Sequence, residues 1–306
     1  MLQILHGTKI PFMNFRRPAY FVSAALVLAT LGYLAVKGPR YSVDFTGGTL
    51  LQVRIAPAAT ADAVRDAVEG GGFKGAEIQQ MTGESKDEFL IRVKNDTTDV
   101  RIIATRITEA ISTRLSGATV EQRRVETVGP KVGKELREKA IWAILASLGS
   151  ILLYVGWRYE FKFALGGVVA ILHDVLVTLG FVLFSGREVS LTVIAALLTI
   201  AGFSINDTIV TFDRIRERSK SHRKESHRQA MDTAVNETLS RTVITALTVF
   251  FCTLALYVWG GEVLNDFSFA MLVGVVVGTY STVFIASALA LDIWTALDRH
   301  KGAQSK

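Results

Sequence analysis

The sequence has few of the residues that build redox or metal sites. Its 306 residues include one cysteine, Cys252, which lies inside an apolar run. A single cysteine cannot form a disulfide within the chain, and no Cys and His cluster has the spacing of a zinc or iron–sulfur site. A phosphate-binding loop, a nucleophile elbow and an HExxH motif are also missing. The sequence thus predicts no metal, no cofactor and no enzymatic activity, and it argues against an ATP-driven pump in this chain.

Charged residues are nearly missing from six long apolar stretches. Half of the chain is hydrophobic and 20% is charged, yet Asp174 and Asp207 are the only Asp, Glu, Lys or Arg residues in these stretches. The stretches are 19–36, 140–157, 163–186, 189–212, 242–261 and 267–291. Each is close to the roughly 20 residues that cross a bilayer as a helix. The alternative is a soluble protein with six very long buried helices, which rarely recur in one chain. The sequence therefore predicts a mainly α-helical membrane protein with six transmembrane helices.

Basic residues lie mostly on one side of these predicted spans. The two short loops on the other side hold Arg187 alone. Because basic loops remain in the cytoplasm, both termini are expected there. The expected parts are a cytoplasmic N-terminus (1–18), a first transmembrane helix (19–36), an extracytoplasmic domain (37–139), a five-helix transmembrane bundle (140–291) with a basic cytoplasmic loop (213–241), and a cytoplasmic tail (292–306).

The extracytoplasmic segment 37–139 has the pattern of a small α+β domain. We expect a strand within 42–55, a helix over 61–69, strands at 76–81 and 88–94 around a turn at 82–87, a helix within 99–116 and a strand at 119–128. The order strand–helix–strand–strand–helix–strand indicates a ferredoxin-like sandwich. Its basic and acidic residues nearly balance, which argues against nucleic acid as a partner.

Asp207 is the most informative residue, because an ionisable group inside a membrane span is costly and usually functional. It lies six residues before Asp213, so about 9 Å inside the cytoplasmic end of the fourth span at 1.5 Å per residue. Arg241 opens the fifth span and can extend inward to a similar depth. We expect the two to pair. Asp207 is the member that can titrate, since arginine keeps its proton. The alternative is a static buried ion pair that only fixes helix packing.

Three further polar residues lie within the predicted spans. His173 and Asp174 are about 17 Å into the third span, near the bilayer midplane, and they form either a proton relay or a hydrogen-bonded tie between helices. Asn206 is expected to tie helices together. The segment 213–241 holds eight Lys and Arg against five Asp and Glu. It is expected to face anionic lipid, and docking to a protein partner is the alternative.

Several motifs resemble one family in the family's order along the chain. They are VDFTGGT at 43–49, VGPKVG at 128–133, LHDV at 172–175, NDTIVTFDRIRE at 206–217 and RT at 241–242. Together they resemble the SecF branch of the SecD/SecF family, accessory subunits of the bacterial Sec translocase. The resemblance covers about 40–291. It implies a six-helix membrane fold of the resistance–nodulation–division type, pseudosymmetric to the helices of SecD.

The resemblance also implies a function, a site and partners. The complex would use the proton gradient to help complete export of a polypeptide through SecYEG in the bacterial inner membrane, with Asp207 and Arg241 in proton conduction. Asp44, Gly47 and Gly48 would form the junction between the outer domain and the membrane. The implied partners are SecD, SecYEG, YajC, YidC and the translocating polypeptide.

Other functions stay open at this point. One is a proton-driven exporter of small molecules or lipids, and another is a scaffold for SecD that conducts no protons. A third is an intramembrane aspartyl protease using Asp174 and Asp207, although the two lie at different depths. The coupling ion, H⁺ or Na⁺, is also open.

Overall fold

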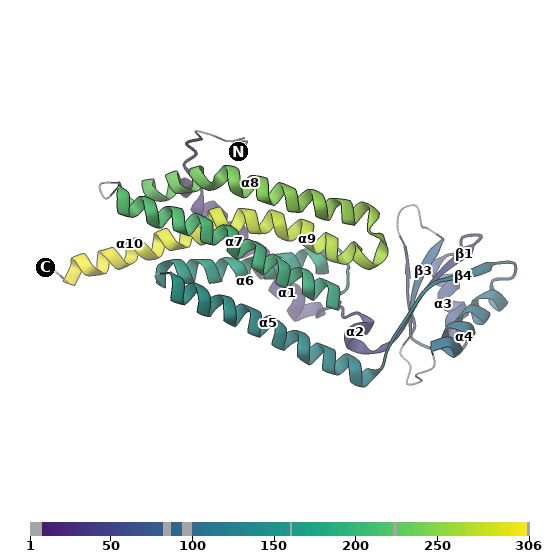
Figure 1. The fold of residues 1–306 in the computed structure, drawn as a ribbon. Helices are drawn as coiled ribbons and strands as arrows, with labels where there is room; N and C mark the ends of the chain where they lie inside the picture. The colour runs from purple at the N-terminus through teal and green to yellow at the C-terminus, as the bar shows by residue number, and fades with distance from the viewer. Residues whose placement is uncertain (1–7, 82–86, 94–99, 160, 223–224, 305–306) are drawn as a thin grey trace. The chain divides into compact units, whose positions relative to one another are not determined.

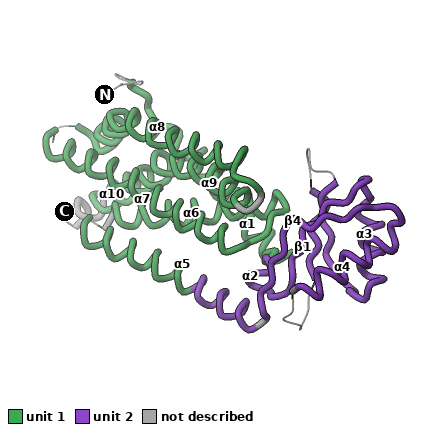
Figure 2. The backbone as a smooth tube through the Cα atoms, turned by 45° about the vertical axis from the view of Figure 1, so that its right-hand side comes forward, with its two compact units in different colours: residues 1–40, 142–306 green, residues 41–141 purple. Residues whose placement is uncertain are grey.

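The computed structural model describes residues 8–81, 87–93, 100–159, 161–222 and 225–304. The chain forms two compact units, one of Met1–Arg40 with Trp142–Lys306 and one of Tyr41–Ile141 (Figure 2).

The first unit is helical (Figure 1). Its elements are η1 (Phe12–Asn14), α1 (Arg16–Lys37), α6 (Phe161–Phe184), α7 (Leu191–Ser221), α8 (His227–Trp259), α9 (Gly261–Ser281), the π-helix η3 (Thr282–Ala286) and α10 (Ser287–Gln304). Helix α5 (Pro130–Arg158) begins in the second unit and continues in the first. Within the described part of the chain, six helical segments are long and apolar enough to cross a membrane, with α9, η3 and α10 together providing the sixth. This confirms the expected six spans.

The six spans differ in how much of their surface the protein itself buries. Helices α6 and α7 and the α9–α10 span bury 50 to 56% of their most apolar windows, whereas α5 and α8 bury 11%. Helix α1 buries 17%. The outer helices instead expose large apolar side chains such as Phe21, Trp142, Trp157 and Trp259. Such surfaces suit hydrocarbon, which is as apolar as a leucine side chain.

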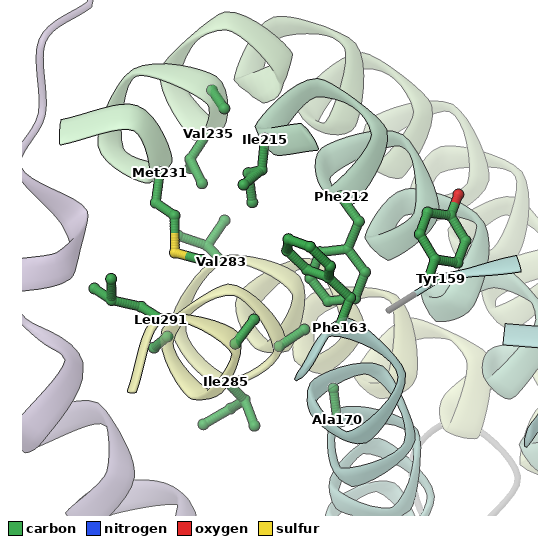
Figure 3. Close-up of a cluster of buried hydrophobic side chains, with 14 of the residues drawn as sticks. Tyr159, Phe163, Ala170, Phe212, Ile215, Met231, Val235, Val283, Ile285 and Leu291 are labelled. Carbon is green, nitrogen blue, oxygen red and sulfur yellow. The ribbon is translucent and has the colours of Figure 1, made fainter. Parts of the chain in front are cut away.

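One large cluster of buried apolar side chains in the bundle lies where α7 meets α8, and another joins α6, α7 and α9. Figure 3 shows Phe212 and Ile215 of α7 in one cluster with Met231 and Val235 of α8 and with Phe163 of α6. Phe163 and Phe212 have ring centroids 5.1 Å apart.

The expectation of a loop over 213–241 is wrong, because most of this segment is helical. Helix α7 continues to Ser221 and α8 begins at His227. The physical reason is the buried apolar residues within the segment, since Ile215 and Met231 are fully enclosed. Ser226 completes the turn with a reciprocal capping box to Gln229, which starts α8.

Among the described residues, the second unit combines a four-stranded antiparallel sheet with the short helix α2 and the longer helices α3 and α4. Its elements are α2 (Val43–Thr46), β1 (Gly48–Ala56), α3 (Ala61–Gly70), β2 (Glu77–Gln80), β3 (Glu88–Val93), α4 (Val100–Arg114) and β4 (Thr119–Val128). The strand order is β2-β3-β1-β4, with every neighbouring pair antiparallel. Leu51 and Phe89 of the sheet share a core with Val64 of α3 and Ile107 of α4. This is the expected ferredoxin-like arrangement.

Two details of the second unit differ from expectation or fall outside the described residues. Residues 43–46, expected within a strand region, form the short helix α2, because the Ser42 hydroxyl accepts a hydrogen bond from the Asp44 amide at its start. Of the turn expected at 82–87, residues 82–86 lie outside the described residues.

Candidate functional site

One face of α7 carries a buried row of polar side chains. Ser204, Asp207, Thr208 and Thr211 follow one another at helical spacing and are each 2% exposed or less. Thr208 Oγ1 lies 3.2 Å from Thr282 Oγ1 of η3, and Thr211 Oγ1 lies 3.5 Å from Thr238 Oγ1 of α8. Polar side chains between membrane helices contribute hydrogen bonds that apolar packing lacks. The row places Asp207 on the face of α7 that contacts η3 and α8.

Asp207 is buried but poorly hydrogen-bonded. Its Oδ1 accepts from the Thr245 hydroxyl of α8 at 3.5 Å, the long limit of a hydrogen bond. Its Oδ2 is enclosed and has no hydrogen-bond partner among the described residues. A carboxylate left this way in an apolar interior is costly. Binding a proton or a cation would therefore stabilise Asp207 more than any other side chain in the row.

Arg241 lies near Asp207 but does not form the expected ion pair with it. No ion pair joins the two among the described residues, and Arg241 is exposed on α8. Thr245 lies one turn beyond Arg241, and its hydroxyl also donates to the Arg241 carbonyl oxygen at 3.0 Å. Thr245 thus contacts the Asp207 carboxylate with its hydroxyl and Arg241 only at the backbone.

Asp174, in contrast, is fully buried and well hydrogen-bonded. Its Oδ2 accepts from the hydroxyls of Ser204 on α7 at 2.5 Å and Ser281 on α9 at 2.6 Å. Its Oδ1 lies 2.9 Å from His173 Nδ1. Asp174 of α6 therefore joins three helices. Asn206 is exposed on α7, and no side-chain hydrogen bond joins it to another described residue.

The sequence did not indicate the partners Ser204, Ser281 and Thr245, nor the π-helix beside Ser281. Serine and threonine are ordinary in membrane helices, so their type alone gives no signal. The spacing of Ser204, Asp207, Thr208 and Thr211 on one helical face is the one pattern that could have revealed the row.

In the second unit, Asp44, Gly47 and Gly48 lie where α2 turns into β1. The Ser42 hydroxyl donates to Asp44 Oδ2 at 3.0 Å, which fixes the start of the turn. Gly47 has φ 71° and ψ 166° and Gly48 has φ 121°. A Cβ on Gly133, near the start of α5, would lie 3.0 Å from the Gly47 nitrogen. Gly133 therefore lets α5 approach the backbone at the end of α2 closely, while positive φ at Gly47 and Gly48 turns the chain from α2 into β1.

Alanine at Gly47 is expected to destabilise the second unit by about 1 to 3 kcal/mol, because the dihedral angles of Gly47 fall in a region essentially restricted to glycine. Gly129→Ala serves as the control. Its Cβ meets nothing within 4 Å, and its φ is not positive. The check is thermal unfolding of both variants beside the wild type. Equal unfolding temperatures for all three would contradict this account.

Ion pairs join the ends of α7 and α8. Arg218 donates to both carboxylate oxygens of Glu225, at 2.8 and 3.0 Å, and to Glu237 at 3.0 Å. Arg214 donates to Glu237 and Glu217. The segment expected to be basic thus uses two of its arginines internally.

The contact of Arg218 with Glu225 is expected to depend on pH. The hydrogen bond from Arg218 holds the pKa of the Glu225 carboxyl below its usual value. Because the folded-state pKa is lowered, the contact stabilises the folded state fully at a pH above the ordinary glutamate pKa of about 4.3. This stabilisation is lost as the pH falls through the lowered pKa. Amide hydrogen exchange at 225–229 should therefore accelerate in strong acid. Arg218→Met should remove this acid response, whereas Lys220→Met, which changes net charge equally, should keep it. A persisting response in Arg218→Met would refute the assignment.

Two family profiles match the chain. One, described as protein export membrane protein SecD/SecF, C-terminal, matches residues 107–296. The other, described as the SecD/SecF GG motif, matches residues 32–59, which include Gly47 and Gly48.

Curated relatives agree with these profiles. The chain is 42% identical over 295 residues to the protein translocase subunit SecF of Vibrio alginolyticus, covering 96% of this chain and 93% of the relative. It is 37% identical over 296 residues to the SecF subunit of Escherichia coli O157:H7, covering 95% and 90%. It is also 41% identical to part of the subunit SecDF of Thermus thermophilus, covering 92% of this chain and 38% of that protein.

The fold also matches a solved structure. A crystal structure of SecDF, described as a translocon-associated membrane protein, from Thermus thermophilus superposes with a TM-score of 0.85 at 38% identity. The match covers 95% of this chain and 39% of that chain, so this chain spans about two-fifths of the SecDF polypeptide.

Proposed function

The chain belongs to the SecF family of protein translocase subunits and serves protein export. We propose that it couples the proton gradient to export. Asp207 and Arg241 are the proposed coupling pair. The observation that carries the proposal is Asp207 itself. Its carboxylate is buried on α7 with one unsatisfied oxygen and one long hydrogen bond. A group in this condition gains more from binding a proton than a fully hydrogen-bonded carboxylate does.

The proposed cycle alternates between two states of Asp207. When the carboxylate is charged, it attracts the Arg241 guanidinium, and its long hydrogen bond from Thr245 is replaced by the ion pair. When it is protonated, Arg241 is released toward the surface, where it lies in this structure. Helices α7 and α8 then repack, and the movement is passed to the outer unit, which handles the emerging polypeptide. Asp207 is the proton carrier in this scheme, since arginine keeps its proton.

The energy available is sufficient for such a switch. Moving one charge across 100 mV yields about 2.3 kcal/mol, and one pH unit adds about 1.4 kcal/mol. A few kcal/mol per proton shifts a two-state equilibrium substantially, although a shift from 1:99 to 99:1 needs about 5.5 kcal/mol. More than one protonation event per cycle would close that gap.

We assign the orientation from the basic residues. In this assignment the protein spans a bacterial inner membrane. Both termini and the α7–α8 turn lie on its cytoplasmic side, and residues 37–139 lie on the opposite side. Lys220 and Arg228 are exposed near the turn and would face anionic lipid, because Arg214 and Arg218 are occupied by carboxylates. Each basic residue near an anionic leaflet contributes about 1 kcal/mol.

The partners follow from the family. SecD is the proposed direct partner, since the Thermus thermophilus protein SecDF, about two-fifths of which this chain matches, is a single polypeptide. SecYEG, YajC, YidC and the translocating polypeptide are proposed for the assembled complex.

The test of the function is export into inverted membrane vesicles that contain this chain and its SecD. After ATP-driven initiation, late translocation should continue without ATP while the proton gradient persists and should stop when a protonophore dissipates it. A sodium ionophore should have no such effect. If late translocation ignores the protonophore, this chain is a scaffold for SecD rather than a proton-driven subunit. If the sodium ionophore alone stops it, the coupling ion is Na⁺.

A further inference from the structure

A second buried carboxylate, Asp174, is placed quite differently from Asp207. Its side chain is 0% exposed, and its two oxygens have three partners: Ser204 of α7, Ser281 of α9 and His173 beside it on α6. Bonds to a charged acceptor are about twice as strong as neutral ones. One carboxylate therefore holds three membrane helices together.

Ser281 occupies the position at which the helix changes its hydrogen-bond pattern. It is the last residue of α9, and the π-helix η3 (Thr282–Ala286) begins after it. The Ser281 hydroxyl also lies 3.1 Å from the Gly278 carbonyl oxygen, so it has a second acceptor within reach. Single π-helical turns within long α-helices occur frequently at functional sites. The bond from Ser281 to Asp174 thus fixes the irregular part of the sixth span to α6 and α7.

His173 is an ionisable neighbour of the carboxylate, and one of its ring nitrogens makes no hydrogen bond to the described residues. Its Nδ1 lies 2.9 Å from Asp174 Oδ1, while its Nε2 is enclosed without a hydrogen-bond partner among the described residues. A neutral imidazole beside a carboxylate leaves a net negative charge in an apolar interior, which is unfavourable. One added proton on the pair removes that net charge. Binding of one proton by the pair is therefore favourable in this environment.

We propose that His173 and Asp174 form a second proton-binding site, whose protonation controls how tightly η3 is attached to α6 and α7. Without the added proton, the carboxylate holds both serine hydroxyls. When a proton binds, the negative charge on the pair is neutralised and its hold on the hydroxyls weakens. Ser281 then gives its hydrogen bond to the Gly278 carbonyl oxygen, and η3 is released. The proposal takes the identity of its ligand, H⁺, from the proposed function.

The surrounding ionisable groups do not provide a competing site at the same contact. On α7, Asp207 lies three residues after Ser204 and faces Thr245. On α9, the Tyr280 ring has its centroid 6.1 Å from that of His173, and its hydroxyl donates to the Ala19 carbonyl oxygen of α1. Arg16 and Tyr20 of α1 each donate a hydrogen bond to the Asp292 carboxylate of α10.

The experiment follows amide hydrogen exchange at residues 281–290 as a function of pH. The complex of this chain with its SecD is reconstituted in lipid nanodiscs, and rates are corrected for intrinsic exchange. In the wild type, exchange at 281–290 should accelerate by about tenfold or more as the pH falls, the effect of weakening one hydrogen bond to a charged group. Residues 265–275 of α9 should change little. Asp174→Asn should exchange fast at every pH.

The controls separate this site from Asp207 and from simple loss of a hydroxyl. Asp207→Asn should keep the pH response at 281–290. Thr178→Val, at another fully buried position of α6 whose hydroxyl has no partner among the described residues, should keep it too. If Asp174→Asn responds to pH as the wild type does, or if Asp207→Asn alone removes the response, the second site is refuted. Because exchange is measured rather than export, a failure of Asp207 in export leaves this test intact.

Ser281→Ala keeps the test decisive if Asp174→Asn does not assemble. It leaves the carboxylate in place and removes one of its three donors. Exchange at 281–290 should then be fast already at high pH, with a smaller further acceleration in acid. Wild-type exchange in Ser281→Ala would overturn the proposal.

Discussion

Asparagine in place of Asp207 is expected to abolish the proton dependence of export while the complex with SecD still assembles. Asparagine has nearly the shape of aspartate but takes up no proton and carries no charge. The buried site can hold it, because Thr245 and the enclosed space at Oδ2 already accommodate a planar group. Losing one coupled charge at 100 mV removes about 2.3 kcal/mol, a factor of roughly 50 in the driven equilibrium.

Late translocation into inverted vesicles measures this effect. With ATP removed after initiation, the Asp207→Asn complex should export at the rate that the wild type shows with a protonophore present. Arg241→Met should give the same loss, since the charged state of Asp207 then lacks its cation. Normal gradient-driven export in both variants would make Asp207 a packing residue and the chain a scaffold for SecD.

Two threonines of α8 provide a matched control for the geometry. The Thr245 hydroxyl reaches Asp207, whereas the Thr248 hydroxyl donates to backbone carbonyl oxygens of its own helix. Thr245→Val should change the pH at which gradient-driven export is half-maximal, because it removes the one hydrogen bond to the carboxylate. Thr248→Val should leave that pH unchanged.

The sequence predicted the parts of the fold that depend on whether a segment lies in hydrocarbon or in water. Hydrocarbon excludes charge, so the six spans could be located from the missing Lys, Arg, Asp and Glu residues. The same contrast made Asp174 and Asp207 visible, because a lone charge in an apolar run is conspicuous. The outer sheet followed from its alternating strands and from glycines at helix ends. β4 was predicted at 119–128, the range it occupies.

The sequence could not predict how the helices meet. Ser204 and Ser281 are 77 residues apart and share one carboxylate only because α7 and α9 both pack on α6. The π-helix has no residue pattern of its own. The helical extension over 213–241 was missed because its charges resemble a loop, although Ile215 and Met231 are buried beneath them. The long contact between Thr245 and Asp207 depends on the helix positions and cannot be read from spacing.

A single methyl group at Gly166 is expected to have one of the largest structural effects in the bundle. A Cβ there would lie 2.7 Å from the carbonyl oxygen of Ala286 in η3, so α6 and the π-helix meet backbone to backbone. Backbone cannot move aside as a flexible side chain can. Overpacking of this kind costs about 1 to 3 kcal/mol, and Gly166→Ala should lower the apparent unfolding temperature of the purified complex.

Gly149 of α5 is the matched comparison, with the opposite expected sign. It also lies inside a membrane helix, but a Cβ there meets nothing within 4 Å. Because glycine in a helix interior is about 0.5 to 1 kcal/mol less favourable than alanine, Gly149→Ala should raise the unfolding temperature. Shifts in the same direction for both variants would contradict the close approach at Ala286. Opposite shifts would establish that the backbones of α6 and η3 are in close contact at Gly166.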